Sequence, residues 1–206
     1  VEMIQLRYVL WFFVASLFSC HAQEKTKDIN ANIFGFATSN TFTYFNVADT
    51  LFINKVIEIN PQVLRFPGGA VGNFYHFGRD GYGFEFHEID KYHGGKFPKR
   101  ARGLDNYREK KRHSHDYIDD LIVLARQTNA AVVLVANPFT DEDSDIILMI
   151  EKLRKNDIDI TGVELGSELS NRSYFLKGYT IHDYLVFAQR CSENIKKHFP
   201  DIKTAV

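Results

Sequence analysis

The sequence has little cysteine and no excess of charge of either sign, and each shortage excludes a class of protein. Two cysteines occur among the 206 residues, and Cys20 falls in the segment that we expect to be removed on export. Cys191 would then be the only thiol, which excludes an intrachain disulfide framework, and we interpret it as a small buried hydrophobe in a helix. The 25 basic and 26 acidic residues give a formal net charge of -1, so charge offers no reason to expect a nucleic-acid partner.

Long apolar runs are also scarce, and the single one lies near the N-terminus. Arg7 precedes YVLWFFVASLF, which is too short to span a bilayer comfortably, and small residues follow it. This pattern predicts a secretory signal peptide over 1–22 and a polar leader over 23–30. An alternative is a bacterial lipobox with lipidation of Cys20. We therefore expect an exported bacterial protein without a transmembrane helix, periplasmic, extracellular or lipid-anchored at the outer membrane.

Several familiar catalytic signatures are missing. FPGGAVG (66–72) lacks the spacing and the lysine of a phosphate-binding loop, so we interpret it as a tight turn. GSEL (166–169) lacks the G-x-S-x-G elbow of serine hydrolases. HSHD (113–116) places two histidines close together, but no cysteine joins them. We expect these histidines to form hydrogen bonds or contact a sugar, and we predict no metal and no cofactor.

What the sequence does have is a regular alternation of strand and helix patterns, typical of βαβ units and a parallel sheet. An open doubly wound sheet and a (β/α)8 barrel both fit. The alternation therefore predicts an α/β fold over 31–206 and leaves these two architectures open. Ser114 is expected to cap the second helix, and Thr180 with Asp183 to form a capping box. The predicted strands are 32–38, 63–66, 130–136, 160–166 and 202–206, and the predicted helices are 49–60, 115–128, 144–156 and 181–198.

The connection over 68–113 is far longer than a usual loop between a strand and a helix. In a barrel it would lie at the C-terminal face, where the chemistry of such enzymes takes place. We favour a substrate-facing loop over an insertion with a small core of its own. Its basic end, 99–113, fits either a patch for an anionic polymer or a solvated run before a helix.

The strand VELG carries an acidic residue at a position that should be buried. Side chains alternate along a strand, so Val163 and Leu165 share the face beneath the helices, and Glu164 faces the interior. A buried carboxylate needs a partner. Arg65 is the only basic residue inside a predicted strand before the last one, so we predict an Arg65–Glu164 ion pair.

Glu168 lies just past the end of the same strand. At the rim of a barrel, a partly desolvated carboxyl can serve as a general acid near neutral pH. An ordinary exposed loop acid fits the position as well, and position alone does not decide between the two.

Two segments carry a resemblance to a known family. LRFPGGAVGNFYHF (64–77) and GVELGSEL (162–169) resemble the ends of strands two and four in the clan of retaining (β/α)8 glycoside hydrolases. The closest likeness is to bacterial α-L-arabinofuranosidase-like and β-glucuronidase (heparanase)-like members, over about 32–206 in order and spacing. The resemblance implies a partial TIM (β/α)8 barrel, with about the first four βα units plus the start of strand five. It also implies a carbohydrate substrate and cleavage of O-glycosidic bonds by two carboxylates.

The resemblance also implies roles for individual residues. Glu168 matches the acid/base, and Ser167 stands where the family has an asparagine that binds the sugar. Asn137 matches a substrate-contacting asparagine, although it equally fits a residue that turns the chain before a proline. Two further roles follow from position rather than from the resemblance: His76, directly after the glycine turn, is expected to face substrate, and Arg65, as the partner of Glu164, is expected to brace the site.

The family's second carboxylate, the nucleophile, ends strand seven, whereas this sequence stops in the fifth predicted strand. We therefore expect the N-terminal part of a longer enzyme, with the acid/base present, the nucleophile missing and no activity as this chain alone. Two other functions stay open. One is a non-catalytic carbohydrate-binding relative in which Ser167 marks a degenerate site, and the other is a metal-dependent hydrolase that uses the histidines of the long connection.

Overall fold

The computed structural model describes Asn30 and residues 33–140 and 143–206. The chain divides into the units Val1–Asn30 and Ala31–Val206, and everything below concerns the second unit. The predicted signal peptide, the possible lipidation site Cys20 and the polar leader up to residue 29 lie outside the described residues.

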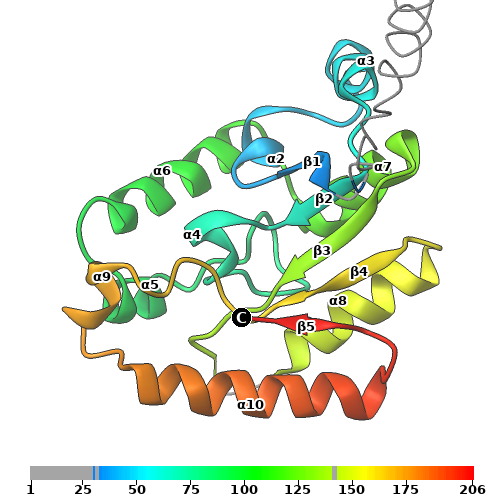
Figure 1. Cartoon of the computed structure of the whole chain (residues 1–206). Coiled ribbons are helices and arrows are strands. Elements are labelled where there is room, and N and C mark those ends of the chain that lie inside the picture. The colour runs from blue at the N-terminus through cyan, green and yellow to red at the C-terminus, as the bar shows by residue number, and fades with distance from the viewer. Residues whose placement is uncertain (1–29, 31–32, 141–142) are drawn as a thin grey trace, which may run out of the picture. The chain divides into compact units, whose positions relative to one another are not determined.

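The second unit is a mixed α/β fold built on a five-stranded parallel sheet, which confirms the α/β part of the predicted fold (Figure 1). The strands lie in chain order, each hydrogen-bonded to the next. Each overlaps a predicted strand: β2 has the predicted bounds, and β1, β3, β4 and β5 are shorter than predicted. Their bounds are β1 Gly35–Ala37, β2 Val63–Phe66, β3 Ala131–Val135, β4 Ile160–Glu164 and β5 Thr204–Ala205.

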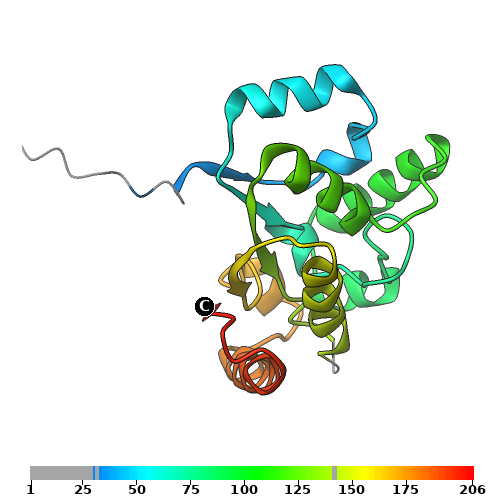
Figure 2. The same cartoon turned by 90° about the vertical axis from the view of Figure 1, so that its right-hand side faces the viewer.

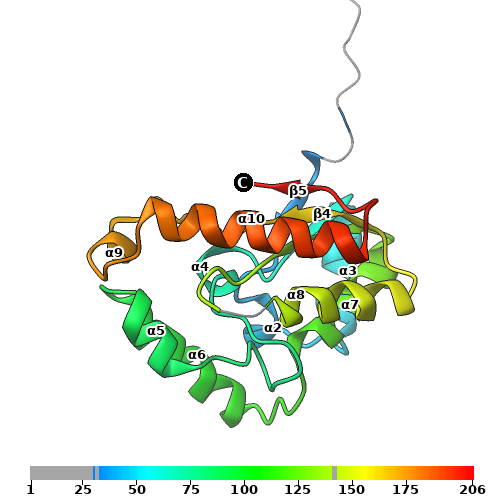
Figure 3. The ribbon, with the colours of Figure 1, turned by 90° about the horizontal axis from the view of Figure 1, so that it is seen from below.

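One helix layer connects and covers the strands. Helix α3 joins β1 to β2, α7 joins β2 to β3, α8 joins β3 to β4, and α10 joins β4 to β5. Figures 2 and 3 show α7 next to α8, and an ion pair between Lys152 and Asp119 links the two helices. Their bounds are α3 Thr50–Ile59, α7 Tyr117–Thr128, α8 Ser144–Lys155 and α10 Ile181–His198.

Helix starts follow the capping chemistry of the sequence. The Thr180 hydroxyl accepts from the backbone N–H of Asp183, whose carboxylate accepts from that of Thr180, so the capping box is confirmed. Ser114 does not cap α7, contrary to expectation. Asp116 takes that place, because the helix begins at Tyr117 and the Asp116 carboxylate accepts from the backbone N–H of Ile118.

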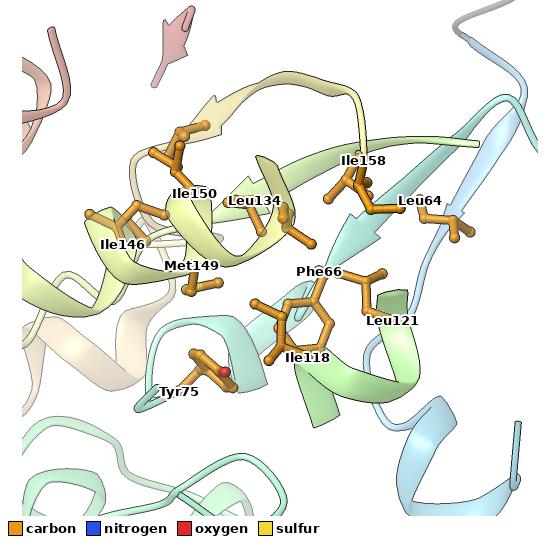
Figure 4. Close-up of a cluster of buried hydrophobic side chains, with 14 of the residues drawn as sticks. Leu64, Phe66, Tyr75, Ile118, Leu121, Leu134, Ile146, Met149, Ile150 and Ile158 are labelled. Atoms are coloured by element: carbon orange, nitrogen blue, oxygen red, sulfur yellow. The ribbon is translucent and has the colours of Figure 1, made fainter. Parts of the chain in front are cut away.

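The core lies between the sheet and this helix layer (Figure 4). Leu64 and Phe66 of β2 and Leu134 of β3 are completely buried there. Burial of such a side chain contributes roughly 1.5–3 kcal/mol. The helices add the following buried side chains: Ile118 and Leu121 from α7, and Ile146, Met149 and Ile150 from α8.

The opposite face of the sheet is less covered. Val63, Arg65 and Val133 on this face are partly exposed, in contrast to their buried neighbours along the strands. Parallel sheets usually have both faces covered. This half-open face is where the predicted charged pair lies.

The long connection over 68–113, which we interpreted as a loop, contains helices. It forms α4 Gly69–Gly72, α5 Phe86–Tyr92 and α6 Phe97–Lys110, and Figure 1 shows α5 beyond the carboxyl ends of the strands, on the same side as α9 Arg172–Phe175. The remaining short helix, α2 Thr41–Tyr44, follows β1 near the start of the unit. Aromatic residues explain the difference, because they build a second core. We call it the aromatic cluster, and its buried members are Phe74, Ile89, Phe97, Ala101, Phe139, Tyr174 and Tyr179.

The aromatic cluster also joins the loops that follow β3 and β4. The Phe74 ring stacks on Phe139 at a centroid distance of 4.8 Å, and Phe139 lies 5.1 Å from the ring of Tyr174. The insertion is thus packed onto the loops at the carboxyl ends of the strands. Within the described residues, no helix is long and apolar enough to cross a membrane.

Candidate active site

The predicted pair of Arg65 and Glu164 is present on the half-open face of the sheet. Arg65 Nε donates to Glu164 Oε2 at 2.6 Å, and Arg65 Nη2 donates to Glu164 Oε1 at 2.6 Å. The two side chains are 25% and 29% exposed. The pairing is therefore bidentate and only partly screened by solvent. The prediction of this ion pair is confirmed.

Ser167 extends this pair toward the carboxyl end of β4. Arg65 Nη2 also donates to Ser167 Oγ at 2.8 Å, and Ser167 is 2% exposed. The serine hydroxyl thus already has a partner within the protein. Arg65, Glu164 and Ser167 form one connected group of side chains.

Asn73, which was not among the predicted site residues, holds the same serine from the other side. Its Nδ2 donates to the Ser167 carbonyl at 2.6 Å, and its Oδ1 accepts from the Ser167 N–H at 2.7 Å. Nδ2 also donates to the hydroxyl of Tyr174 at 3.0 Å, and Asn73 is completely buried. The one feature of the sequence that could have indicated this role was a single asparagine between Gly72 and Phe74. We call its two bonds to Ser167 the Asn73–Ser167 clamp.

Glu168 lies at the rim of an open hollow. Its backbone is left-handed, with φ 53°, and the residue is exposed, so of the two environments that its position left open it has the exposed one. Its carboxylate makes no hydrogen bond within the described part of the chain. The hollow, which we call the Glu168 hollow, has a volume of about 380 Å³, and its lining includes Glu164, Leu169, Phe175, Tyr179, Ile181 and Tyr184.

The turn that carries Glu168 depends on a glycine. Gly166 has φ 82°, and a Cβ atom there would lie 2.6 Å from Leu169 Cδ1 and 3.4 Å from Pro138 Cβ. A side chain at this position would be strained and crowded. The turn therefore lies against the loop that follows β3 and, through Asn73, against the segment that follows β2.

His76 lies apart from this group. Its Nε2 is 2.8 Å from Glu88 Oε2, and its Nδ1 is 3.1 Å from Asp145 Oδ2. Burial acts to lower the pKa of His76, but the hydrogen bonds to Asp145 and Glu88 outweigh it and raise the pKa to about 9. His76 is only 9% exposed, so the two carboxylates engage both ring nitrogens of a charged imidazolium.

A second hollow of about 470 Å³ lies beside His76, between α5 and the start of α8. Its lining includes Arg79, Glu85, Glu88 and Asp145. Neither His76 nor Asn137 belongs to the lining of the Glu168 hollow.

Asn137 forms a local turn. Its Oδ1 accepts from the backbone N–H of Phe139 at 2.9 Å, and its Nδ2 donates to the Tyr75 carbonyl at 3.4 Å and lies 3.5 Å from Glu88 Oε2. Asn137 is 6% exposed. The structure thus brings Arg65 and Ser167 together beside Glu168, and it places Asn137 in the group around Glu88.

No group of three or more His, Cys, Asp or Glu side chains in the described residues has an arrangement that could hold a metal ion. Comparison of the chain with models of known protein families and with curated proteins gives no match to either. The function therefore has to be argued from the geometry of the site and the chemistry of its residues.

Proposed function

We propose that the described sheet belongs to a (β/α)8 barrel and that the protein is an exported retaining glycoside hydrolase. The order of the strands supports the barrel. A doubly wound sheet reverses its strand order at a switch point, whereas a barrel keeps its strands in chain order. The five strands described here run from β1 to β5 without a reversal. The half-open face with its charged pair would then be the barrel interior.

The single observation that carries the function is the position of Glu168 at the carboxyl end of β4. It lies on the rim of a hollow, beside the connected group of Arg65, Glu164 and Ser167. In (β/α)8 enzymes, catalytic residues come from this end of the strands. Glu168 would protonate the leaving glycosidic oxygen and then take a proton from the incoming water.

A retaining mechanism also needs a nucleophilic carboxylate about 5–5.5 Å from the acid/base. Glu164 is unsuited to this role, because both of its oxygens accept hydrogen bonds from Arg65. We propose that the nucleophile comes from a further strand of the barrel, so that the unit described here does not hydrolyse glycosides alone. Arg65 and Glu164 would brace the site from within the barrel.

Carbohydrate contacts are proposed around the Glu168 hollow. Phe175 and Tyr184 line it, and Phe175 is 44% exposed, so its ring is available to a sugar face. Ser167 would contact the sugar through a water molecule, because its hydroxyl is buried and already accepts from Arg65. Asn137 and His76 would act on substrate only by shaping the loops around the neighbouring hollow. No cofactor takes part in this mechanism.

The test is Glu168→Gln in the full-length protein, assayed on oligosaccharides and on aryl glycosides. Removal of a general acid is expected to lower hydrolysis of the oligosaccharides by about 10²–10⁴-fold. The loss should be smaller for aryl glycosides, whose leaving groups need less protonation. Glu151→Gln, at an exposed glutamate of α8, is the matched control and should keep the full rate. Hydrolysis at full rate by Glu168→Gln would refute the acid/base assignment.

A non-catalytic carbohydrate-binding protein is the second candidate. Two observations favour it: Glu168 is exposed, and the Ser167 hydroxyl already accepts a hydrogen bond from Arg65. Sugar binding by the unmutated protein in calorimetry, with no turnover over days, would support this candidate.

A further inference from the structure

The Asn73–Ser167 clamp fixes a single residue by both of its backbone polar groups. One amide side chain accepts from the Ser167 N–H at 2.7 Å and donates to the Ser167 carbonyl at 2.6 Å. The peptide groups on the two sides of Ser167 therefore cannot rotate without breaking a hydrogen bond. Because Asn73 is completely buried, water does not compete for these bonds.

Ser167 directly precedes the residue with the unusual backbone. Glu168 adopts φ 53°, a conformation that non-glycine residues rarely occupy and that persists when the surroundings determine it. On the other side of Ser167, Gly166 is also left-handed, with φ 82°. The clamp thus lies at the centre of a turn whose two neighbouring residues both have positive φ.

A third contact completes the hold on this serine. Arg65 Nη2 donates to Ser167 Oγ at 2.8 Å, so the backbone and the side chain of Ser167 are bound by residues of two different segments. Arg65 also forms the ion pair with Glu164. Asn73, unlike Arg65, binds the backbone of Ser167, and its amide also donates to the Tyr174 hydroxyl.

We propose that Asn73 is a positioning residue of the candidate active site, which orients Glu168 toward the hollow by holding the Ser167 backbone in the turn. This inference rests on the proposed function of Glu168 as the acid/base. Asn73 would act through Ser167, since no contact joins its side chain to Glu168 among those described. A misplaced acid slows the chemical step and leaves ground-state binding of the sugar unchanged.

The first arm of the test compares kcat and KM of Asn73→Ala with those of the unmutated full-length protein. A displacement of about 1 Å at a reacting group can cost about 100-fold in rate, so we expect kcat to fall by about 10–100-fold with KM within twofold. Tyr174→Phe removes the Asn73 contact outside the clamp and should keep kcat within twofold. Leu121→Ala, at a buried core residue of α7, is the control for a general loss of stability. It should lower the melting temperature without lowering kcat.

The second arm uses Asn73→Asp and pH. An ionised aspartate keeps the acceptor for the Ser167 N–H and loses the donor to the Ser167 carbonyl. A protonated aspartic acid restores both contacts, because its O–H donates and its carbonyl accepts. The kcat of Asn73→Asp, relative to that of the unmutated protein, should therefore recover as pH falls. A ratio that does not change with pH would contradict the clamp.

The third arm measures hydrogen exchange of the Ser167 amide, which does not depend on turnover. We expect slow exchange in the unmutated protein and exchange at least tenfold faster in Asn73→Ala, with the amides of β3 unchanged. Equal exchange in the two proteins would overturn the inference. So would a kcat of Asn73→Ala that matches the unmutated protein while Glu168→Gln is inactive. Full activity of Glu168→Gln would instead overturn the proposed function.

Discussion

The ion pair between Arg65 and Glu164 leads to a prediction about stability. Arg65→Met leaves the Glu164 carboxylate on a half-open sheet face without its two charged donors, and Glu164→Met leaves the guanidinium unpaired. Breaking a fully buried pair costs about 3–5 kcal/mol. The side chains here are 25% and 29% exposed, so solvent screens part of this cost. We expect each single substitution to lower the free energy of unfolding by roughly 2–3 kcal/mol.

The double variant Arg65→Met with Glu164→Met removes both charges together, and the two methionines can pack against the sheet face. We expect its free energy of unfolding, measured by urea denaturation, to fall by less than the sum of the two single losses. The difference, which is the coupling energy, should be about 1–2 kcal/mol or more. Lys55 and Glu58 provide the matched control, because their ion pair is 64% and 63% exposed. Removing either of them should cost about 0.5 kcal/mol or less. Strictly additive losses for Arg65 and Glu164, or single losses as small as those of the control, would refute this reasoning.

Two further predictions concern titratable groups. Hydrogen bonds to Asp145 and Glu88 overcome burial and raise the pKa of His76 to about 9, above its ordinary value of 6.5. Its stabilisation, at most about 3 kcal/mol, is therefore complete below about pH 6.5 and lost as pH rises through about 9. The stability gap between the unmutated protein and His76→Gln should close over this window, and a gap independent of pH would contradict the assignment. Burial raises the pKa of Cys191 to about 12, so a disulfide reagent at pH 8 should label it only after unfolding in urea; prompt labelling of the folded protein would show that the thiol is accessible.

The sheet and its ion pair could be predicted because both follow from patterns within single strands. The two-residue period of β4 separates Val163, which is 2% exposed beneath the helices, from Glu164 on the other face. Arg65 was then the one cation available in a preceding strand. The strand order was not predicted uniquely, because alternation of strands and helices fits two architectures.

The remainder of the site depends on contacts between segments far apart in the chain. Asn73 is 94 residues from Ser167 and 101 residues from Tyr174, and no local pattern reports such pairings. His76 likewise meets Asp145 across 69 residues. The helices of the insertion were not predicted, because the long connection after a strand was interpreted as a substrate-facing loop. Phe74 and Phe97 of the insertion instead pack in the aromatic cluster.

Tyr174 belongs to two of these assemblies at once. Its ring packs in the aromatic cluster, and its hydroxyl accepts a hydrogen bond from the same Asn73 that holds Ser167. The loop after β4 is therefore tied to the insertion by both apolar and polar contacts. A segment bound in this way opens only when its neighbours open with it, so the insertion and the Glu168 turn should fluctuate as one cooperative unit. Substitutions in α5 or α6 would then change the positions that the Glu168 carboxyl group can occupy, even where no residue next to Glu168 changes.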